Sequence, residues 1–219
     1  METPFLKSDL FLNEYNTVYE PSEDTFILID ALEIDLNLIR SLKPVICVEI
    51  GCGSGIVLTA VGKALSNDCH FFLGTDVNEK AAQLSQHCAL GNGIHIFEAV
   101  VTDLLSAFDA RLMHCVDLLI FNPPYVVTPN DEIEKSAISR SWAGGENGRV
   151  VIDRFINTVV PQITSETCLI YLVVIQENKP EEIIDAMRIC GFYYSKIMLE
   201  RKCKNERLKV IRFCRQKYD

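Results

Sequence analysis

The stretch PVICVEIGCGSGIVLTAVGKAL, residues 44 to 65, decides the fold of this chain. It joins an apolar run (44–50) to a glycine-rich turn (51–55) and then to a helix-forming segment (56–65). A short apolar run that ends in a turn predicts a buried strand, and the segment after the turn predicts a helix that packs back on the sheet. A strand, a glycine turn and a helix in this order predict the first unit of a parallel α/β sheet.

The rest of the chain repeats this alternation of strands and helices. Further strands are predicted over 70–76, 94–103, 116–121, 168–175, 192–201 and 206–214, and further helices over 20–32, 78–90, 148–160 and 180–190. A polar turn at 204–206 joins the last two strands, so these are expected to pair antiparallel. We therefore predict a seven-stranded, mostly parallel, doubly wound sheet with an antiparallel strand pair at its C-terminal end.

Composition excludes several classes of protein. No apolar run reaches the ~18 residues of a membrane span, and the first residues lack the pattern of a secretory signal. The nine cysteines form no CxxC pair and the four histidines show no ligand spacing, so no metal site is expected. We expect reduced cysteines in a protein of the cytoplasm, with the nucleus as a second compartment.

The net charge of −9 argues against a protein that binds nucleic acid, because phosphates require a positive field. The segment 201–217 is an exception, since it holds eight Lys or Arg residues and one acid, Glu206. This segment either forms a solvated face of the last two strands or docks an acidic protein or ribosomal RNA.

Polar residues follow the first four predicted strands, where ligands of such sheets bind. Gly51, Gly53 and Gly55 form a GxGxG turn in which glycine permits positive φ and close approach of a ligand. Glu49 precedes the turn; a carboxylate there disfavours a pyrophosphate and suits a cation, such as the α-amino group of a bound amino acid. No lysine of a phosphate-binding loop follows.

The acids after the second and third strands indicate the other groups of this ligand. Asp76 stands where a carboxylate accepts both hydroxyls of a ribose, or else it caps the following helix. Asp103 can bind an adenine amino group with Leu104 against the ring, or else it is also a cap. An adenine, a ribose and a cationic amino-acid arm together indicate S-adenosyl-L-methionine.

The fourth strand ends in IFNPPYVV, residues 120 to 127. Pro123 and Pro124 stop the strand and stiffen the chain after it. Asn122 Oδ1 and the Pro123 carbonyl can each accept one N–H of a planar NH2 group, and Tyr125 can stack on that group and exclude water. The alternative is a rigid proline turn without a chemical role.

The glycine turn, the acid after the second strand and NPPY resemble a class I, Rossmann-like methyltransferase that depends on S-adenosyl-L-methionine. Three stretches, VYEPSEDTFILIDAL (18–32), FNPPYVVTP (121–129) and SWAGGENGRVVIDRF (141–155), resemble the eukaryotic HemK-like glutamine methyltransferases. The resemblance covers residues 17 to 213. It implies N5-methylation of the glutamine in the GGQ loop of the class 1 translation release factor.

The resemblance also implies a domain plan and further site residues. A single domain over 1–219 would comprise an N-terminal extension (1–16), a cofactor-lid helix (17–33) and the core (44–219). Thr25 would approach the cofactor. Asn122, Pro123 and Tyr125 would be catalytic, and Asn122 would also contact the cofactor. The substrate would be bound by Asn122, Pro123, Pro124, Tyr125 and Trp142, although Trp142 could equally anchor its loop to the core.

A partner is implied as well. Enzymes of this kind act with a small zinc-binding activator subunit that covers an edge of the sheet. In the usual methyltransferase strand order the third strand is an edge, and here the apolar stretch 95–101 would need a cover. The alternative is an edge shielded by the chain's own loops.

Other activities stay open at this point. Adenine N6-methylation of DNA or RNA also uses NPPY, but it needs a flipped base and a basic groove. A lysine substrate fits the two acceptors less well, because a lysine must first lose a proton. A non-catalytic binding subunit would have no need of an intact glycine turn and NPPY. The range of substrates, and whether the chain is active without a partner, do not follow from the sequence.

Overall fold

The computed structural model describes residues 1–6, 17–65, 71–108, 110–133, 135–136, 138–203 and 206–218. Part of the predicted N-terminal extension (7–16), Cys69, the first residue of the predicted strand 70–76 and residues 204–205 of the predicted turn lie outside this range.

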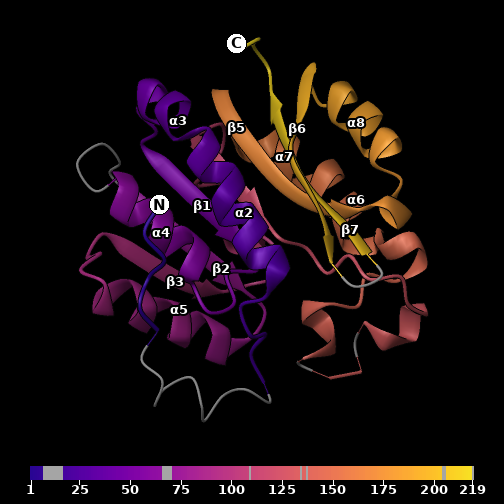
Figure 1. The fold of residues 1–219 in the computed structure, drawn as a ribbon, viewed down its shortest axis with the longest axis horizontal. Coiled ribbons are helices and arrows are strands. Elements are labelled where there is room, and N and C mark those ends of the chain that lie inside the picture. The colour runs from indigo at the N-terminus through magenta and orange to yellow at the C-terminus, as the bar shows by residue number, and fades with distance from the viewer. Residues whose placement is uncertain are drawn as a thin grey trace.

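The described residues form a seven-stranded sheet with the order β3-β2-β1-β4-β5-β7-β6 (Figure 1). Its strands are β1 (Ile46–Ile50), β2 (Phe71–Asp76), β3 (Phe97–Val101), β4 (Val116–Phe121), β5 (Thr164–Ile175), β6 (Tyr194–Cys203) and β7 (Glu206–Cys214). The first five strands are parallel, and β7 pairs antiparallel with both β5 and β6. The predicted doubly wound sheet and its C-terminal antiparallel pair are therefore confirmed.

Helices cover both faces of the sheet. They are α2 (Glu23–Ile34), α3 (Leu36–Leu42), α4 (Ile56–Leu65), α5 (Glu79–Gly91), α6 (Val150–Arg154), α7 (Val160–Ile163) and α8 (Pro180–Ile189). Helix α4 contacts both α2 and α5, which places these three on one face. The strand order reverses between β1 and β4, so right-handed crossovers place α6, α7 and α8 on the other face (Figure 1).

Several elements differ from those predicted, and β5 begins at Thr164 rather than at the predicted residue 168. Helix α3 was not predicted, and the predicted strand 94–103 is shorter, at Phe97–Val101. The predicted helix 148–160 is interrupted, because a π-helical segment, Phe155–Val159, separates α6 from α7. Pro161 has no N–H to donate to the α-helical ladder, which explains why the regular hydrogen-bond pattern changes just before it.

A buried ion pair fixes the end of α2 to the sheet. Asp35, which follows α2, accepts hydrogen bonds at Oδ2 from the Tyr171 hydroxyl (2.8 Å) and from Arg212 Nη1 (2.9 Å). Tyr171 lies in β5 and Arg212 in β7, and both are almost completely buried. Helix α2 therefore has a fixed position on the sheet, which matters because its first turn contributes to the site.

The basic segment 201–217 is partly neutralised by this chain's own acids. Arg201 pairs with Glu23 and Asp30, and Arg207 pairs with Glu200. Arg212 is used inside the core. These pairs favour a structural role for the segment over a docking surface for nucleic acid.

Strand β3 is an edge of the sheet, as expected. Ile96, directly before β3, and Val101, its last residue, are 55% and 50% exposed. The side-chain amide of Gln86, in α5, donates to the Phe97 carbonyl (2.9 Å) and accepts from Ala99 N (3.0 Å). The backbone N–H and C=O groups of the even-numbered residues around β3 face β2, so those of the odd-numbered residues face outward. Gln86 binds part of this outer edge, and no other described strand pairs with it.

Among the described helices, none combines the length and apolarity that crossing a bilayer would require. The eight cysteines of the described part of the chain are free thiols.

Candidate functional site

A cavity of about 400 Å³ opens at the carboxyl ends of the strands, where the strand order reverses between β1 and β4. It brings together most of the predicted site. Its walls include Thr25, Glu49, Gly51, Gly53, Asp76, Asp103, Leu104, Asn122 and Pro124. Residues 17–19 and 21, which precede α2, also line it. The lid helix predicted over 17–33 is α2, which begins at Glu23, so the residues before it line the cavity as a non-helical segment.

The glycine turn has the conformation that its sequence predicts. Gly51, Gly53 and Gly55 have φ angles of +64°, +50° and +76°, which favour glycine. Gly51 and Gly53 line the cavity, but Gly55 does not. A Cβ at Gly55 would come within 2.6 Å of Ser85 Cα, so this glycine serves the packing of α5 against the turn.

Glu49, at the end of β1, is buried and faces both the cavity and a helix. Its Oε2 accepts a 2.9 Å hydrogen bond from Leu58 N, in the first turn of α4. Burial raises the pKa of Glu49 to about 8; the Leu58 N–H opposes this shift and the neighbouring Asp76 adds to it. The carboxyl group is therefore poised to ionise when a cation binds beside it.

Asp76, at the end of β2, holds the glycine turn in place. Its Oδ2 accepts from Gly53 N (3.0 Å) and its Oδ1 from Asn78 N (2.8 Å). The residue that caps α5 is Asn78, whose side chain accepts from Lys80 N, and not Asp76. A carboxylate has about four acceptor positions, so Asp76 can still accept hydroxyl groups from the cavity.

Asp103 has a partner that the sequence analysis missed. Its Oδ2 accepts a 2.6 Å charged hydrogen bond from Arg154 Nη2, at the end of α6. Arg154 lines the same cavity and directly precedes the π-helical segment. Leu104, beside Asp103, is buried with φ of +52°. No local pattern points to Arg154, since its partner lies 51 residues away.

The NPPY corner, residues 122–125, is organised by an aspartate of the predicted helix 20–32 that was not among the predicted site residues. Asp24, in the first turn of α2, is 4% exposed, and its Oδ2 accepts from Asn122 Nδ2 at 3.0 Å. The amide nitrogen must face the carboxylate, because the carboxylate only accepts. The amide oxygen then points away, and among the described residues Asn122 Oδ1 is buried with no hydrogen-bond partner.

Asp24 also holds two tyrosines. Its Oδ2 accepts from the Tyr125 hydroxyl (3.2 Å) and its Oδ1 from the Tyr19 hydroxyl (3.3 Å). Burial, followed by the charge of Asp24, raises the pKa of Tyr125, so this phenol is neutral and donates. Thr25 N adds a 2.8 Å bond to Asp24 Oδ1. Asp24 is thus a fixed anion behind Asn122.

A second cavity, of about 350 Å³, lies on the other side of this corner. Tyr125, Trp142, Tyr19 and Asp24 are among its walls, so Trp142 faces this space rather than the first cavity. Pro123 is buried and is not among the residues that line either cavity. The structure therefore brings Asn122 and Tyr125 to opposite cavities, with Asp24 between them.

Comparisons with known proteins agree with this architecture. Residues 27–156 match the model of the methyltransferase small domain. The Homo sapiens protein "Methyltransferase HEMK2" is 42% identical over 91% of this chain and 90% of its own length. The Schizosaccharomyces pombe protein "eRF1 methyltransferase catalytic subunit mtq2" is 35% identical over 98% and 96%.

A solved structure is also similar. It is that of the E. cuniculi Mtq2–Trm112 complex, described as responsible for methylation of the eRF1 termination factor. The TM-score is 0.67 at 29% identity, and the match covers 91% of this chain and 99% of the other.

The strand order, the glycine turn and the NPPY corner, together with these matches, define a methyltransferase. More narrowly, the chain belongs to the eukaryotic HemK-like methyltransferases of the methyltransferase small domain family.

Proposed function

We propose that this protein is an S-adenosyl-L-methionine-dependent methyltransferase that methylates the side-chain amide of the glutamine in the GGQ loop of a class 1 translation release factor. The observation that carries the proposal is the Asn122 amide oxygen, which is buried at the switch point without a partner. A planar NH2 group would satisfy this acceptor. The S. pombe and E. cuniculi relatives, whose names connect them with eRF1, support this substrate.

The first cavity fits the proposed cofactor. Asp76 and Glu49 supply acceptors for a ribose and for a cationic amino group, at the positions where β2 and β1 end. Gly51 and Gly53 leave the backbone open to close approach. Asp103 and Leu104 would take the adenine, and Thr25 would close the cavity from α2.

The residues of the NPPY corner would orient the amide nitrogen of the target glutamine, which is a weak nucleophile. An amide nitrogen reacts poorly, because its lone pair is conjugated with the carbonyl group. The bound cofactor supplies the activated methyl group on a sulfonium. Asn122 Oδ1 and the Pro123 carbonyl would each accept one N–H of the target, which fixes its plane and orientation. No prior deprotonation is needed, since an amide proton is too weakly acidic to remove first.

Asp24 adds an electrostatic contribution. Positive charge develops on the nitrogen as the new C–N bond forms, and Asn122 Oδ1 stabilises it by accepting a stronger hydrogen bond. Asp24 polarises the same amide from behind through its 3.0 Å bond to Asn122 Nδ2. The arrangement exists before the substrate binds, so little reorganisation is required. Pro124 would wall the target side chain beside Asn122, whereas Tyr125 and Trp142 line the second cavity and would contact the loop that carries the target.

The open part of the β3 edge supports the expected partner, a small zinc-binding activator subunit. Ile96 and Val101 supply the exposed apolar surface, while Gln86 protects only part of the strand. We also propose a location in the cytoplasm, with the nucleus as a second compartment, and a single methyltransferase domain over 1–219.

Labelled S-adenosylmethionine tests the function directly. The chain is co-expressed with and without the activator and offered a release factor, its GGQ→GGR variant and an adenine-containing oligonucleotide. Label on the unmodified factor alone, strongest with the activator, is the expected result. Label on the oligonucleotide but not on the factor would replace the glutamine substrate by adenine, and label on the GGR variant would show a different acceptor residue.

A further inference from the structure

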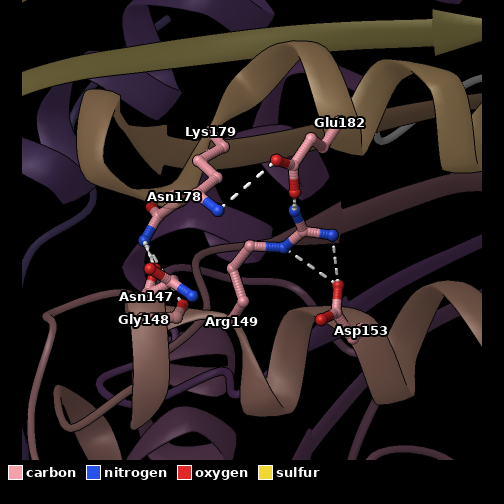
Figure 2. Close-up of polar contacts among 7 residues, drawn as sticks. All are labelled: Asn147, Gly148, Arg149, Asp153, Asn178, Lys179 and Glu182. Carbon is pink, nitrogen blue, oxygen red and sulfur yellow. Dashed lines mark hydrogen bonds and ion pairs between the residues drawn. The ribbon is translucent and has the colours of Figure 1, made fainter.

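The glycine-rich loop AGGENG, residues 143 to 148, and the residues after β5 have no role in the function proposed so far. Figure 2 shows how they meet, through Asn178, Asn147 and Gly148. Asn178 is the third residue after β5, at the end of the short 3-10 helix Gln176–Asn178, and is fully buried. A buried amide needs partners for both its donors and its acceptor, so the identity of these partners shows what it holds together.

Asn178 uses both ends of its amide. Its Oδ1 accepts a 2.8 Å hydrogen bond from Ile175 N, which fixes the side chain to the end of β5. Its Nδ2 donates to the Tyr125 carbonyl at 2.8 Å and to the Asn147 and Gly148 carbonyls at 3.0 and 3.3 Å. One side chain therefore connects β5, the NPPY corner and the glycine loop.

The glycines of the loop are needed for this contact. A Cβ at Gly148, where φ is +65°, would overlap the Tyr125 carbonyl oxygen, and one at Gly144 would come within 2.6 Å of the Pro124 carbonyl oxygen. The loop backbone thus lies directly against Pro124 and Tyr125. Glycine at these positions allows an approach that a side chain would prevent.

Backbone hydrogen bonds continue the contact beyond the corner. Val126 N donates to the Trp142 carbonyl (3.0 Å), and Gly144 N donates to the Val126 carbonyl (2.8 Å). Trp142, whose indole faces the second cavity, is therefore attached by its backbone to the residue after Tyr125. As the only tryptophan of the chain, it reports on this contact.

The outer side of the loop is held by a separate set of interactions. Arg149 donates to Asp153 Oδ1 from Nε (3.0 Å) and Nη2 (2.6 Å), and to Glu182 Oε2 from Nη1 (2.7 Å) (Figure 2). These ion pairs fix the loop to α6 and α8 but do not touch the NPPY corner. Glu182 is exposed and also pairs with Lys179 (3.4 Å), but it makes none of the hydrogen bonds of Asn178, so we expect Glu182→Gln to leave those contacts in place.

We infer that Asn178 is a positioning residue that sets the backbone of Tyr125, and through it the direction of the Asn122 amide oxygen. The inference rests on the proposed amide methylation. Tyr125 is held at both ends, by Asn178 at its carbonyl and by Asp24 at its hydroxyl. Tyr125 is thus fixed at two points, and the two rigid prolines 123 and 124 connect it to Asn122, which leaves Asn122 little freedom to rotate its acceptor away from the target.

Asparagine is required at 178 for a chemical reason. Its NH2 donates to carbonyls while its oxygen accepts from Ile175 N. Aspartate has the same shape and keeps that acceptor, but it would set a second oxygen against three carbonyl oxygens. Asn178→Asp therefore removes the donor contacts with almost no change in volume.

The test compares Asn178→Asp with Glu182→Gln in the complex with the activator subunit. For Asn178→Asp we expect kcat to fall ~10- to ~100-fold, as for other small misplacements of reacting groups. The affinity for S-adenosylhomocysteine, measured by calorimetry, should stay within about twofold, and Trp142 emission should shift. Glu182→Gln should leave all three unchanged. Unchanged kcat and emission in folded Asn178→Asp, or equal losses of kcat and of S-adenosylhomocysteine affinity, would overturn the inference.

Asn178→Ala provides the same test without an added charge if the aspartate variant does not fold. The calorimetric and fluorescence measurements need no methyl acceptor. If the wild-type complex fails to label the release factor, the proposed function fails, while a Trp142 shift confined to the Asn178 variants would still support the contact.

Discussion

Asn122 Nδ2 donates to Asp24 Oδ2 at 3.0 Å, and this contact directs the amide oxygen of Asn122 away from the carboxylate. The oxygen is buried and has no partner among the residues that the structure describes. An unsatisfied buried acceptor is costly, by about 1–3 kcal/mol, so its retention needs a reason. A substrate N–H that binds there would supply one, and the contact between Asn122 and Asp24 is then part of the catalytic machinery.

Replacing Asn122 by alanine should separate catalysis from cofactor binding. The variant loses the acceptor, so we expect kcat to fall by ~100-fold or more, as when one preorganised transition-state partner is removed. The affinity for S-adenosylhomocysteine should stay within several-fold, because most of the first cavity's wall remains. Turnover and calorimetric titration measure the two quantities. Equal losses in both would contradict this division.

Asp24→Asn should also lower kcat more than the affinity for S-adenosylhomocysteine, but its effect on kcat should be smaller than that of Asn122→Ala. The amide has one acceptor oxygen for the donors of Asn122, Tyr125 and Tyr19, and it lacks the charge. Hydrogen bonds to a charged group contribute about 1.5–3 kcal/mol, which corresponds to a ~10- to ~100-fold lower kcat. Asp30→Asn, on the same helix but exposed, is the matched control and should retain wild-type kcat. A similar loss in both variants would assign the effect to helix α2 in general.

The fold was predictable from local patterns, whereas much of the site was not. The turn with Gly51 and Gly53 and its flanking strand and helix lie within one continuous stretch. Asp24 and Asn122 are 98 residues apart, and nothing in the sequence distinguishes Asp24 from Glu23 beside it, which pairs with Arg201 at the surface. Only the position of α2 on the sheet decides which of the two acids reaches the NPPY corner.

The same argument applies to the residues after β4. NPPY itself was recognisable, but the contact of Asn178 with Tyr125 spans 53 residues and involves a backbone carbonyl, which leaves no side-chain pattern. Arg154 and Asp103 meet across 51 residues. The break before Pro161, in contrast, had a local signal in the proline itself, and a helix predicted through residue 160 overlooked its effect on the preceding turn.

Binding of the cofactor product should depend on pH through Glu49. The carboxyl group has a pKa of about 8 in the free protein, so it is mostly neutral at pH 6. A cationic amino group beside it favours the ionised form, so affinity for S-adenosylhomocysteine should rise from pH 6 to 8 and proton release should accompany binding. Calorimetry in buffers of different ionisation enthalpy counts the protons.

The stability of the free protein should fall as the pH rises, whereas the affinity for S-adenosylhomocysteine should increase. The folded pKa of Glu49 lies above the ordinary value of 4.5, so its contribution to stability is complete below that value and is lost as pH rises through about 8. Glu49→Gln keeps a neutral side chain at every pH and should remove both dependences. Affinity that does not change between pH 6 and 8 in the wild type would show that Glu49 does not meet the amino group.

Removing one partner of the buried pair between Asp35 and Arg212 should destabilise the protein more than breaking ion pairs at the surface. Arg212→Ala leaves the Asp35 carboxylate buried with the Tyr171 hydroxyl as its one side-chain donor among the described residues, and should cost about 3–5 kcal/mol of unfolding free energy. Arg201→Ala breaks two exposed pairs and should cost less than about 2 kcal/mol, since each contributes at most ~1 kcal/mol. Urea unfolding compares them, and similar losses would refute a special role for the buried pair.

Charged substitutions on the β3 edge should weaken the complex with the activator subunit. Ile96→Lys combined with Val101→Lys places two charges on the exposed apolar strand, where a partner would have to bury them. Ile189→Lys is the matched control, because Ile189 is 89% exposed at the end of α8, a helix that lies far from β3 (Figure 1). Co-purification and calorimetry of the complex should show a large loss only for the edge variant.

In the absence of the activator subunit, the same two substitutions should make the isolated chain less prone to aggregate. An open apolar edge promotes association between copies, and lysine on an edge strand prevents it. We therefore expect the edge variant to be less prone to aggregate than the wild type when both lack the activator, as light scattering would show. If the edge variant still bound the activator normally, or if Ile189→Lys disrupted the complex instead, the partner would occupy another surface.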